Sequence, residues 1–292
     1  MSRHARRRAS LLVVGALVLL SACSADPEPT LTAAPALTPA TTGSPTPTPA
    51  PTDEPSAAQS VAGGAYLALG DSVTFGVGVP EPQRNGFPAR VADRLALSET
   101  RVFAVPGETA GGFLARRLDD VLAAIRELGP RVELVTIGLG ANELLRSRRA
   151  PPCEADPDGE ACHAVVDAAV ADASESLDAV VAEVADALTA EGSDARILVL
   201  AYYNPDVEPI AADAIVGADG LVGCTDSEPN PGLNDRIACV AAARDVALVD
   251  LYAAFLGREA ELTRIGAGDI HPNDTGYSVI ADAIVAAVEA SP

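Results

Sequence analysis

The chain has 292 residues and a formal net charge of −21, with 41 acidic residues against 20 basic ones. A polyanion of this kind repels nucleic acid and anionic lipid headgroups, so we expect no nucleic-acid partner. Aromatic residues make up 3% of the chain and tryptophan is absent, so no platform for stacking sugar rings is visible.

Residues 1–22 have the pattern of an export signal. Several arginines precede an apolar core from Leu11 to Leu20, which is shorter than the roughly 20 residues that span a bilayer. The core runs into Leu20-Ser21-Ala22-Cys23, which resembles the lipobox of bacterial lipoproteins; the alternative is a plain secretory signal with a chance cysteine. We expect Cys23 to carry the lipid anchor, placing the protein on the outer face of the cell membrane or in the cell wall.

Residues 23–60 form the next segment, which is rich in proline and threonine and poor in large apolar side chains. Such a composition buries too little surface to offset the entropy of ordering, so we predict a disordered, extended linker. The remaining residues, 61–292, contain no second linker and no internal repeat. We therefore expect them to form one folded domain, and we expect a monomer.

Short apolar runs alternate with amphipathic stretches along this domain. Strands are predicted at 65–70, 101–105, 132–138, 196–202 and 246–251. Helices are predicted at 164–190 and about 275–290, where apolar residues recur at helical spacing. Nearly continuous apolar strands separated by helices indicate an α/β fold, with a parallel sheet of about five strands covered on both faces.

Four cysteines remain beyond Cys23. An even number in an exported domain predicts disulfides, and three pairings are possible. Proximity in the sequence favours Cys153–Cys162 and Cys224–Cys239. A metal site would need closer cysteine spacing and more histidine, so we expect no metal. His163, beside Cys162, is predicted to be a surface loop residue.

Two residues indicate serine chemistry. Ser72 follows the first predicted strand directly, and His271 precedes the last predicted helix. The chain has three histidines, and the other two lie in the export signal and among the cysteines. A serine at the carboxyl end of a buried strand, with an imidazole to take its proton, is typical of an activated nucleophile. Gly107 and Asn142 follow the second and third strands, so we expect all four at one site.

The chain resembles the SGNH, or GDSL, hydrolases from about Tyr66 to its C-terminus. The matching blocks are Gly70-Asp71-Ser72, Pro106-Gly107-Glu108-Thr109, Gly140-Ala141-Asn142-Glu143 and His271-Pro272-Asn273. The resemblance implies a three-layer α/β/α, flavodoxin-like fold and ester hydrolysis without a cofactor. It implies Ser72 as nucleophile and His271 as base, with an oxyanion hole formed by the N–H groups of Ser72 and Gly107 and the amide of Asn142. The absence of lysine is typical of a high-GC bacterium, which indicates an actinobacterial lipoprotein.

The chain departs from the family pattern at two positions. Glu143 replaces an aspartate, and we interpret it as structural. The third member of the catalytic triad is expected three residues before the histidine, where this chain has Gly268, whereas Asp269 lies two before it. Either the Asp269 carboxylate or a main-chain carbonyl then orients His271. Asp71 is predicted to support the turn that carries the nucleophile.

The hypothesis is an exported, lipid-anchored serine esterase or lipase. Its substrates are acyl lipids or acyl groups on cell-wall glycans, and the low content of aromatic residues, with no tryptophan, favours acyl esters of the first kind. The alternatives are a deacetylase of cell-wall glycans and a catalytically silent cell-wall binding lipoprotein. We expect the loops 144–163 and 203–231 to shape the pocket, and Tyr202 and Tyr203 either to wall it or to lie in the core.

Overall fold

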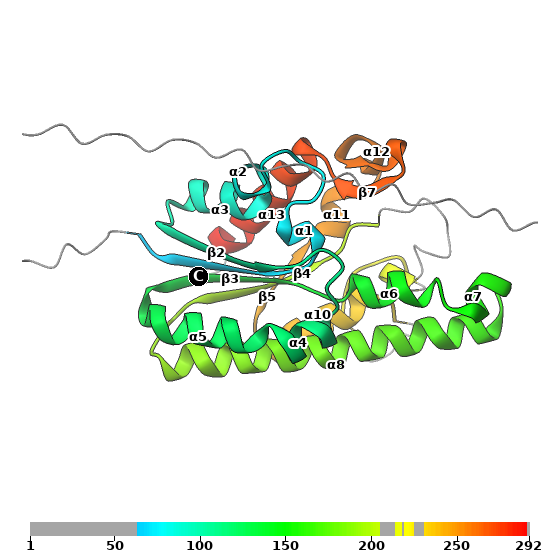
Figure 1. The fold of residues 1–292 in the computed structure, drawn as a ribbon, viewed down its shortest axis with the longest axis horizontal. Helices are drawn as coiled ribbons and strands as arrows, with labels where there is room; N and C mark the ends of the chain where they lie inside the picture. Colours follow the sequence, from blue (N-terminus) through cyan, green and yellow to red (C-terminus); the bar gives the residue numbers. More distant parts are fainter. Residues whose placement is uncertain (1–62, 205–213, 218, 225–230, 291–292) are drawn as a thin grey trace, which may run out of the picture. The chain divides into compact units, whose positions relative to one another are not determined.

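The computed structural model describes residues 63–204, 214–217, 219–224 and 231–290. Within them, five strands form one parallel sheet in the order β2-β1-β3-β4-β5 (Figure 1). The strands are β1 (Ala65–Gly70), β2 (Glu99–Ala104), β3 (Val132–Gly138), β4 (Arg196–Ala201) and β5 (Ala247–Asp250). This is the strand order of flavodoxin-like folds, so the predicted three-layer architecture is confirmed. The predicted export signal, Cys23 and the predicted linker lie outside the described residues.

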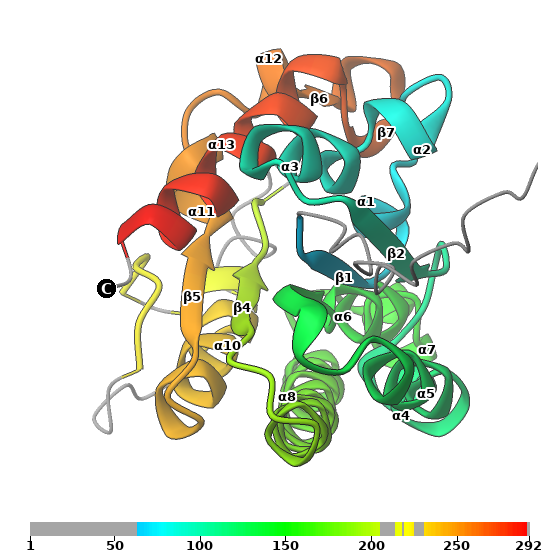
Figure 2. The same ribbon diagram turned by 90° about the vertical axis from the view of Figure 1, so that its left-hand side faces the viewer.

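Helices cover both faces of the sheet (Figure 2). One face carries α4 (Ala110–Arg116), α5 (Leu118–Leu128), α6 (Ala141–Ser147), α8 (Glu160–Ala190) and α10 (Leu233–Ala243). The other face carries α3 (Phe87–Leu95), α11 (Leu251–Phe255) and α13 (Asp274–Ala290). Shorter elements are α1 (Ser72–Phe75), α2 (Pro82–Asn85), α7 (Pro151–Ala155), α12 (Glu259–Leu262) and the antiparallel pair β6 (Thr263–Arg264) and β7 (Asp269–Pro272).

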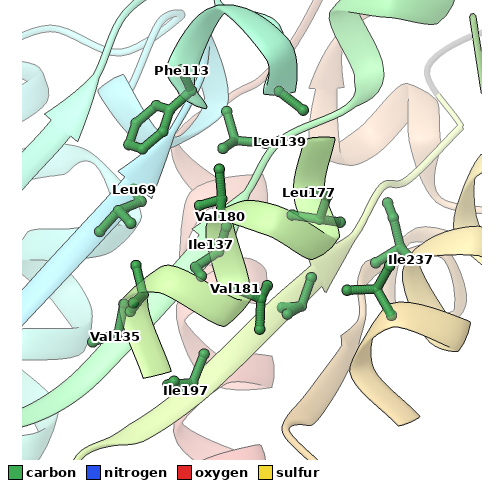
Figure 3. Packing of buried hydrophobic residues seen from close by; sticks show 14 of the residues in the cluster. Leu69, Phe113, Val135, Ile137, Leu139, Leu177, Val180, Val181, Ile197 and Ile237 are labelled. Carbon is green, nitrogen blue, oxygen red and sulfur yellow. The ribbon is translucent and has the colours of Figure 1, made fainter. Parts of the chain in front are cut away.

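The larger of the two cores lies between the sheet and α4, α5, α8 and α10 (Figure 3). The apolar stripe predicted for the long helix faces this core, because Leu177, Val180, Val181 and Val184 are all nearly or completely buried. They pack with strand residues such as Ile137, which the continuous apolar composition of the strands supplies. Burial of these side chains fixes the sheet, and with it the positions of the strand ends.

The second core lies on the opposite face of the sheet, under α3, α11 and α13. Tyr277, Ile280 and Ile284 of α13 are fully buried there, as the predicted stripe requires, and Phe255 stacks on Tyr203 at 4.5 Å between ring centroids. The hydroxyl of Tyr277 donates a 2.7 Å hydrogen bond to the carbonyl of Val77. This bond ties α13, which directly follows the predicted base, to the segment that follows the predicted nucleophile.

Two expectations about the segment 144–163 are wrong. Instead of a loop, this segment contains the end of α6, all of α7 and the first turn of α8, which begins at Glu160 rather than at residue 164. His163 is exposed but lies in that helix. The structure contains the disulfide Cys153–Cys162, which joins α7 to α8, and the disulfide Cys224–Cys239, which joins residue 224 to α10.

Candidate active site

A pocket opens beyond the carboxyl ends of β1, β3 and β4, where a parallel sheet places functional residues. Its polar lining includes Ser72, Asn142 and His271, three of the predicted site residues. The other lining residues are Asp71, Val73, Ala141, Leu144, Leu145, Arg148, Tyr202, Tyr203, Asn204, Ile215 and Ile270. Gly107 is not among them, although it belongs to the neighbouring turn after β2. Although several lining residues are polar, most of the exposed surface of the pocket wall is apolar.

Ser72 is the first residue of α1, in a tight turn directly after β1. Oδ1 of Asp71 accepts a 2.9 Å hydrogen bond from the N–H of Val73 and so caps this helix. Gly70 allows the turn, because a Cβ there would lie 2.1 Å from the Thr74 hydroxyl and 2.7 Å from the carbonyl of Gly138. The result is a half-buried serine that borders the pocket.

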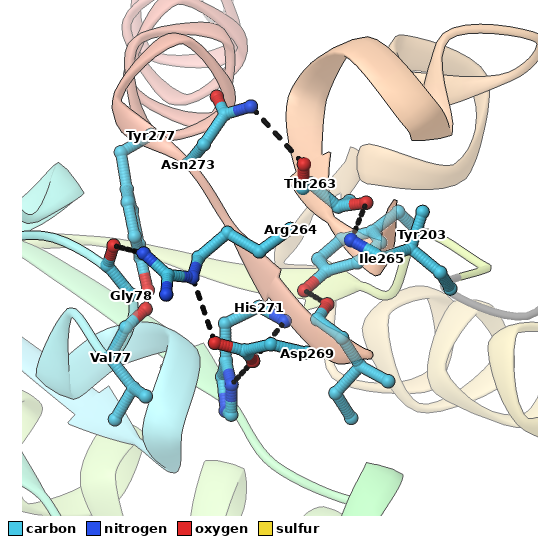
Figure 4. A network of polar contacts seen from close by, with 11 residues as sticks. Val77, Gly78, Tyr203, Thr263, Arg264, Ile265, Asp269, His271, Asn273 and Tyr277 are labelled. Carbon is cyan, nitrogen blue, oxygen red and sulfur yellow. Dashed lines mark hydrogen bonds and ion pairs between the residues drawn. The ribbon is translucent and has the colours of Figure 1, made fainter. Parts of the chain in front are cut away.

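His271 lies in β7, and its ring is held by Asp269 (Figure 4). Nδ1 of His271 is 2.6 Å from Oδ1 of Asp269, and the same oxygen accepts a 3.1 Å hydrogen bond from the backbone N–H of His271. A proton on Nδ1 leaves the other ring nitrogen, Nε2, as the acceptor that a general base needs. At Nδ1 the structure therefore has the Asp269 carboxylate and not a main-chain carbonyl.

The Asp269 carboxylate is stabilised as an anion. Burial acts to raise its pKa, but hydrogen bonds from the ring and backbone of His271, together with Arg264, outweigh burial and hold the pKa below its usual range. Nε of Arg264 donates to Oδ2 at 2.9 Å. Ser72 and His271 line the same pocket. In the described structure no hydrogen bond joins them, and a bond between a nucleophile and its base often forms only when substrate is bound.

Asn142 lies between the turn of Ser72 and the turn of Gly107. Its side-chain nitrogen Nδ2 donates to the carbonyl of Glu108 at 2.8 Å and, over a longer 3.3 Å, to Oδ2 of Asp71. Within the described chain, the backbone N–H groups of Ser72 and Gly107 have no acceptor. Gly107 has a φ of +80°, and its carbonyl accepts a 2.6 Å hydrogen bond from Arg146. The arrangement offers the vacant N–H of Ser72 and the amide of Asn142 at the pocket, and the vacant N–H of Gly107 in the turn that Asn142 contacts through Glu108.

Asp71 is an acid that lines the pocket and is deeply buried, with 2% of its surface exposed. Burial raises its pKa to about 6, and this rise is limited by hydrogen bonds from the Val73 N–H and the Tyr202 hydroxyl and by the charge of His271. Tyr202 is held in turn by Asn234 of α10, whose fully buried side chain pairs with both the N–H and the carbonyl of Tyr202 at 2.8 Å. Asp71 therefore supports the nucleophile turn, and the wall residue Tyr202 contacts it directly.

Glu143 contacts the start of α4 rather than the pocket. Its Oε1 accepts a 3.3 Å hydrogen bond from the N–H of Gly111, and burial raises its pKa. Nearby, Glu108 is buried and pairs with Arg116 of α4 at 2.5 Å. These carboxylates join the turn after β2 to α4 and α6, on which Asn142 lies.

Several pocket residues carry no recognisable motif in the sequence. Leu144 and Leu145 come from α6, and Ile215 comes from the segment 203–231, most of which lies outside the described residues. Arg264 does not line the pocket but pairs with Asp269 behind it, and a salt-bridging arginine on a short strand has no distinctive pattern in the sequence either. Tyr202 and Tyr203 are buried and also line the pocket, so both interpretations offered for them apply.

In the described part of the chain, no cluster of three or more His, Cys, Asp or Glu side chains is arranged to hold a metal ion. None of the helices described there combines the length and the apolar composition needed to cross a bilayer.

The model of the GDSL-like lipase/acylhydrolase family matches residues 68–279 of the chain. No curated protein matches it in sequence. Among solved structures, a lipase from a goat rumen metagenome has 24% identity and a TM-score of 0.55, over 76% of this chain and 96% of its own. Phospholipase A1 from Streptomyces albidoflavus has 22% identity and a TM-score of 0.53, over 77% and 100%. The acetylxylan esterase Axe2 from Geobacillus stearothermophilus has 19% identity and a TM-score of 0.50, over 77% and 94%.

Proposed function

Since the chain belongs to the GDSL-like lipase/acylhydrolase family and is an ester-hydrolysing enzyme, we propose that Ser72 is its nucleophile and His271 its general base. The observation that carries this proposal is the 2.6 Å contact between His271 Nδ1 and Asp269 Oδ1, at a pocket that Ser72 and His271 share. The contact leaves Nε2 free to accept the serine proton.

The proposed reaction proceeds in two steps. Ser72 Oγ attacks the ester carbonyl carbon while its proton moves to Nε2 of His271, and Asp269 stabilises the imidazolium that forms. The tetrahedral intermediate collapses, the C–O bond to the alcohol breaks, and His271 returns the proton to the leaving alkoxide. A water molecule, deprotonated by His271, then hydrolyses the acyl-serine and restores the enzyme.

We propose that an oxyanion hole binds the carbonyl oxygen of the ester as it becomes negative. It consists of the N–H groups of Ser72 and Gly107 and the amide of Asn142. Two observations support this role: the two N–H groups lack acceptors in the described chain, and Asn142 lines the pocket with Ser72 while it contacts Glu108 in the turn of Gly107. The longer bond of Asn142, at 3.3 Å to Asp71, is the one that an oxyanion would replace. Removal of one such donor typically costs about 10²–10³ in rate.

The apolar wall supports an acyl ester as substrate. Leu144, Leu145, Ile215 and Ile270 suit an acyl chain better than a polar sugar ring. A lipase, a phospholipase A1 and an acetylxylan esterase share the fold, so the fold itself accommodates both lipids and acetylated glycans. Deacetylation of a cell-wall glycan therefore remains the alternative, and acyl length separates the two.

We also propose that the enzyme is exported and held at the membrane by a lipid on Cys23. The pattern of residues 1–22 and the two disulfides support export. Metabolic labelling with a fatty-acid probe tests the anchor: the parent protein takes up label, and Cys23→Ser does not. Equal labelling of both would contradict the lipid anchor and leave the hydrolase proposal untouched.

Hydrolysis of p-nitrophenyl esters from acetate to palmitate tests the activity. We expect turnover and labelling by a serine-directed organophosphate, both lost in Ser72→Ala. Ser98→Ala is the matched control, because the Ser98 hydroxyl contacts only backbone carbonyls near residue 63, far along the sheet from the pocket. A preference for acetate would favour the glycan deacetylase, whereas longer chains would favour acyl lipids. Turnover retained in Ser72→Ala would refute the assignment of the nucleophile.

A further inference from the structure

The two oxygens of the Asp269 carboxylate have different partners (Figure 4). Oδ1 contacts His271: it accepts a hydrogen bond from the backbone N–H at 3.1 Å and lies 2.6 Å from the ring nitrogen Nδ1. Oδ2 accepts from Nε of Arg264 at 2.9 Å. Nη1 of the same guanidinium donates to the carbonyl of Gly78 at 3.0 Å. Arg264 therefore contacts both the acid behind the base and the segment that follows the nucleophile.

The short spacing between the acid and the histidine explains why such a contact is useful. Asp269 lies two residues before His271, so its side chain folds back on its own turn and one oxygen receives both groups of His271. A carboxylate held through one oxygen keeps freedom to rotate about its last side-chain bond. The bond from Arg264 to the second oxygen removes that freedom.

The contact at Gly78 joins two segments that the reaction needs at a fixed distance. The N–H of Val77 donates to the carbonyl of Ser72 at 3.0 Å, so this segment continues the nucleophile turn. Gly78 also packs closely on the histidine strand, because a Cβ there would lie 2.6 Å from the carbonyl of Pro272 and 3.3 Å from Cβ of His271. Its φ of +104° suits glycine as well.

We propose that Arg264 is a positioning residue of the active site, which fixes the Asp269 carboxylate and joins the His271 strand to the segment that follows Ser72. This inference rests on the proposed roles of Ser72, His271 and Asp269. Arg264 does not line the pocket, and its hydrogen bonds go to Asp269 and to the carbonyl of Gly78, so it acts on the site through Asp269. Its side chain is 47% exposed, so solvent screens its charge and its geometry carries most of the effect.

Three variants separate geometry from charge. Arg264→Gln removes both bonds, and we expect kcat to fall about 10–100-fold with KM within about twofold, since small misplacements of a catalytic group act on kcat. Arg264→Lys keeps the charge but cannot bridge the Asp269 carboxylate and the Gly78 carbonyl, and we expect a partial recovery of kcat. Arg258→Gln is the matched control, because Arg258 is 46% exposed and pairs with Glu261 at 2.8 Å on adjacent α12.

The pH profile gives a readout that a merely structural role would not move. Arg264 is one of the groups that hold the pKa of Asp269 below its usual range, and Arg264→Gln removes it. The acid limb of kcat/KM should therefore move to higher pH in Arg264→Gln and return in Arg264→Lys. The other groups facing the pair are Asp71, Tyr203 and Tyr277, and burial raises the pKa of both tyrosines well above neutrality. Burial raises the pKa of Asp71 to about 6, but Arg264 makes no hydrogen bond to Asp71, so the contribution of Asp71 should be equal in all variants.

Histidine labelled with ¹⁵N reports on the same geometry without catalysis. In the parent protein we expect His271 to keep its proton on Nδ1 when neutral, and in Arg264→Gln we expect a mixture of tautomers. An unchanged tautomer together with an unchanged kcat would overturn the proposal, as would an equal loss in Arg258→Gln or full recovery of kcat in Arg264→Lys. If no ester is hydrolysed by the parent protein, the proposed function fails, while the tautomer still decides the role of Arg264.

Discussion

The hydroxyl of Tyr202 donates a 2.9 Å hydrogen bond to Oδ2 of Asp71, the residue that immediately precedes Ser72. Both residues are almost completely buried, and the other carboxylate oxygen of Asp71 caps the helix of the nucleophile through Val73. Asn142 contacts Oδ2 as well. The end of β4 is thereby connected to the nucleophile turn and to the proposed oxyanion donor through a single carboxylate.

Tyr202→Phe should destabilise the protein more at high pH than at low pH. Burial raises the pKa of Asp71 to about 6, and the bond from Tyr202 limits that rise, so its loss raises the pKa further. Ionised Asp71 then costs more in the folded state, and this cost appears only as the pH rises through about 6. We expect a loss of about 1.5–3 kcal/mol in the free energy of unfolding at pH 8 and about 1 kcal/mol at pH 5, measured with urea.

Tyr203→Phe is the control for this prediction. Tyr203 is the adjacent buried tyrosine, but its hydroxyl donates to the carbonyl of Ile270, which does not titrate. Its loss should therefore cost the same at both pH values. A pH-independent effect of Tyr202→Phe would show that Asp71 does not ionise in the folded protein over this range.

Asn142→Ala should lower kcat by about 10²–10³ with little change in KM, because the amide bond to the oxygen strengthens in the transition state. The variant also loses the 2.8 Å bond to the carbonyl of Glu108, so its unfolding should be measured beside its kinetics. In a Ser72→Ala background the same substitution should cost almost nothing further, since the two groups act in one step. Unchanged turnover of Asn142→Ala would remove Asn142 from the site.

The parts of the fold that rest on long apolar patterns could be predicted from the sequence. The strands are nearly continuous apolar runs because both faces of the sheet are buried, and α8 and α13 show their stripes over many turns. The ends of β1 and β3 then bring Ser72 and Asn142 to one pocket, as the predicted parallel sheet requires, and His271 reaches the same pocket from β7, just before α13.

Contacts between distant segments could not be predicted in this way. Arg264 and Gly78 are joined only because β6 and the turn after α1 meet in space, and no periodicity marks such a pair. The short helix α7 was also missed. It has five residues, too few for a periodic signal, and Pro151 and Pro152 resemble loop residues although proline suits the first turn of a helix.

The two disulfides should each contribute about 2–4 kcal/mol by restricting the unfolded chain, because they close segments with sequence separations of 9 and 15 residues. Peptide mapping without reduction should find Cys153 linked to Cys162 and Cys224 linked to Cys239. Double serine variants of each pair, compared in urea with the parent protein, measure the contribution. Crossed links, or free thiols in exported protein, would contradict this pairing.

Asp269→Asn should lower kcat by up to about 10⁴, by analogy with the triads of serine proteases. The arginine makes this effect severe here. Arg264 donates to the outer oxygen position, so the single amide oxygen of the asparagine is drawn toward Arg264 and its NH₂ group faces His271. An NH₂ group opposite Nδ1 favours the tautomer with its proton on Nε2, which cannot accept the proton of Ser72.

The double variant Asp269→Asn with Arg264→Gln tests that explanation. With the guanidinium gone, the amide can turn its oxygen toward His271, so part of the lost kcat should return even though each single substitution is harmful. His271→Ala is the inactive reference for these kcat values. A nearly normal rate for Asp269→Asn beside an inactive His271→Ala would establish a dyad of Ser72 and His271, and the 2.6 Å contact of Asp269 would then be structural only.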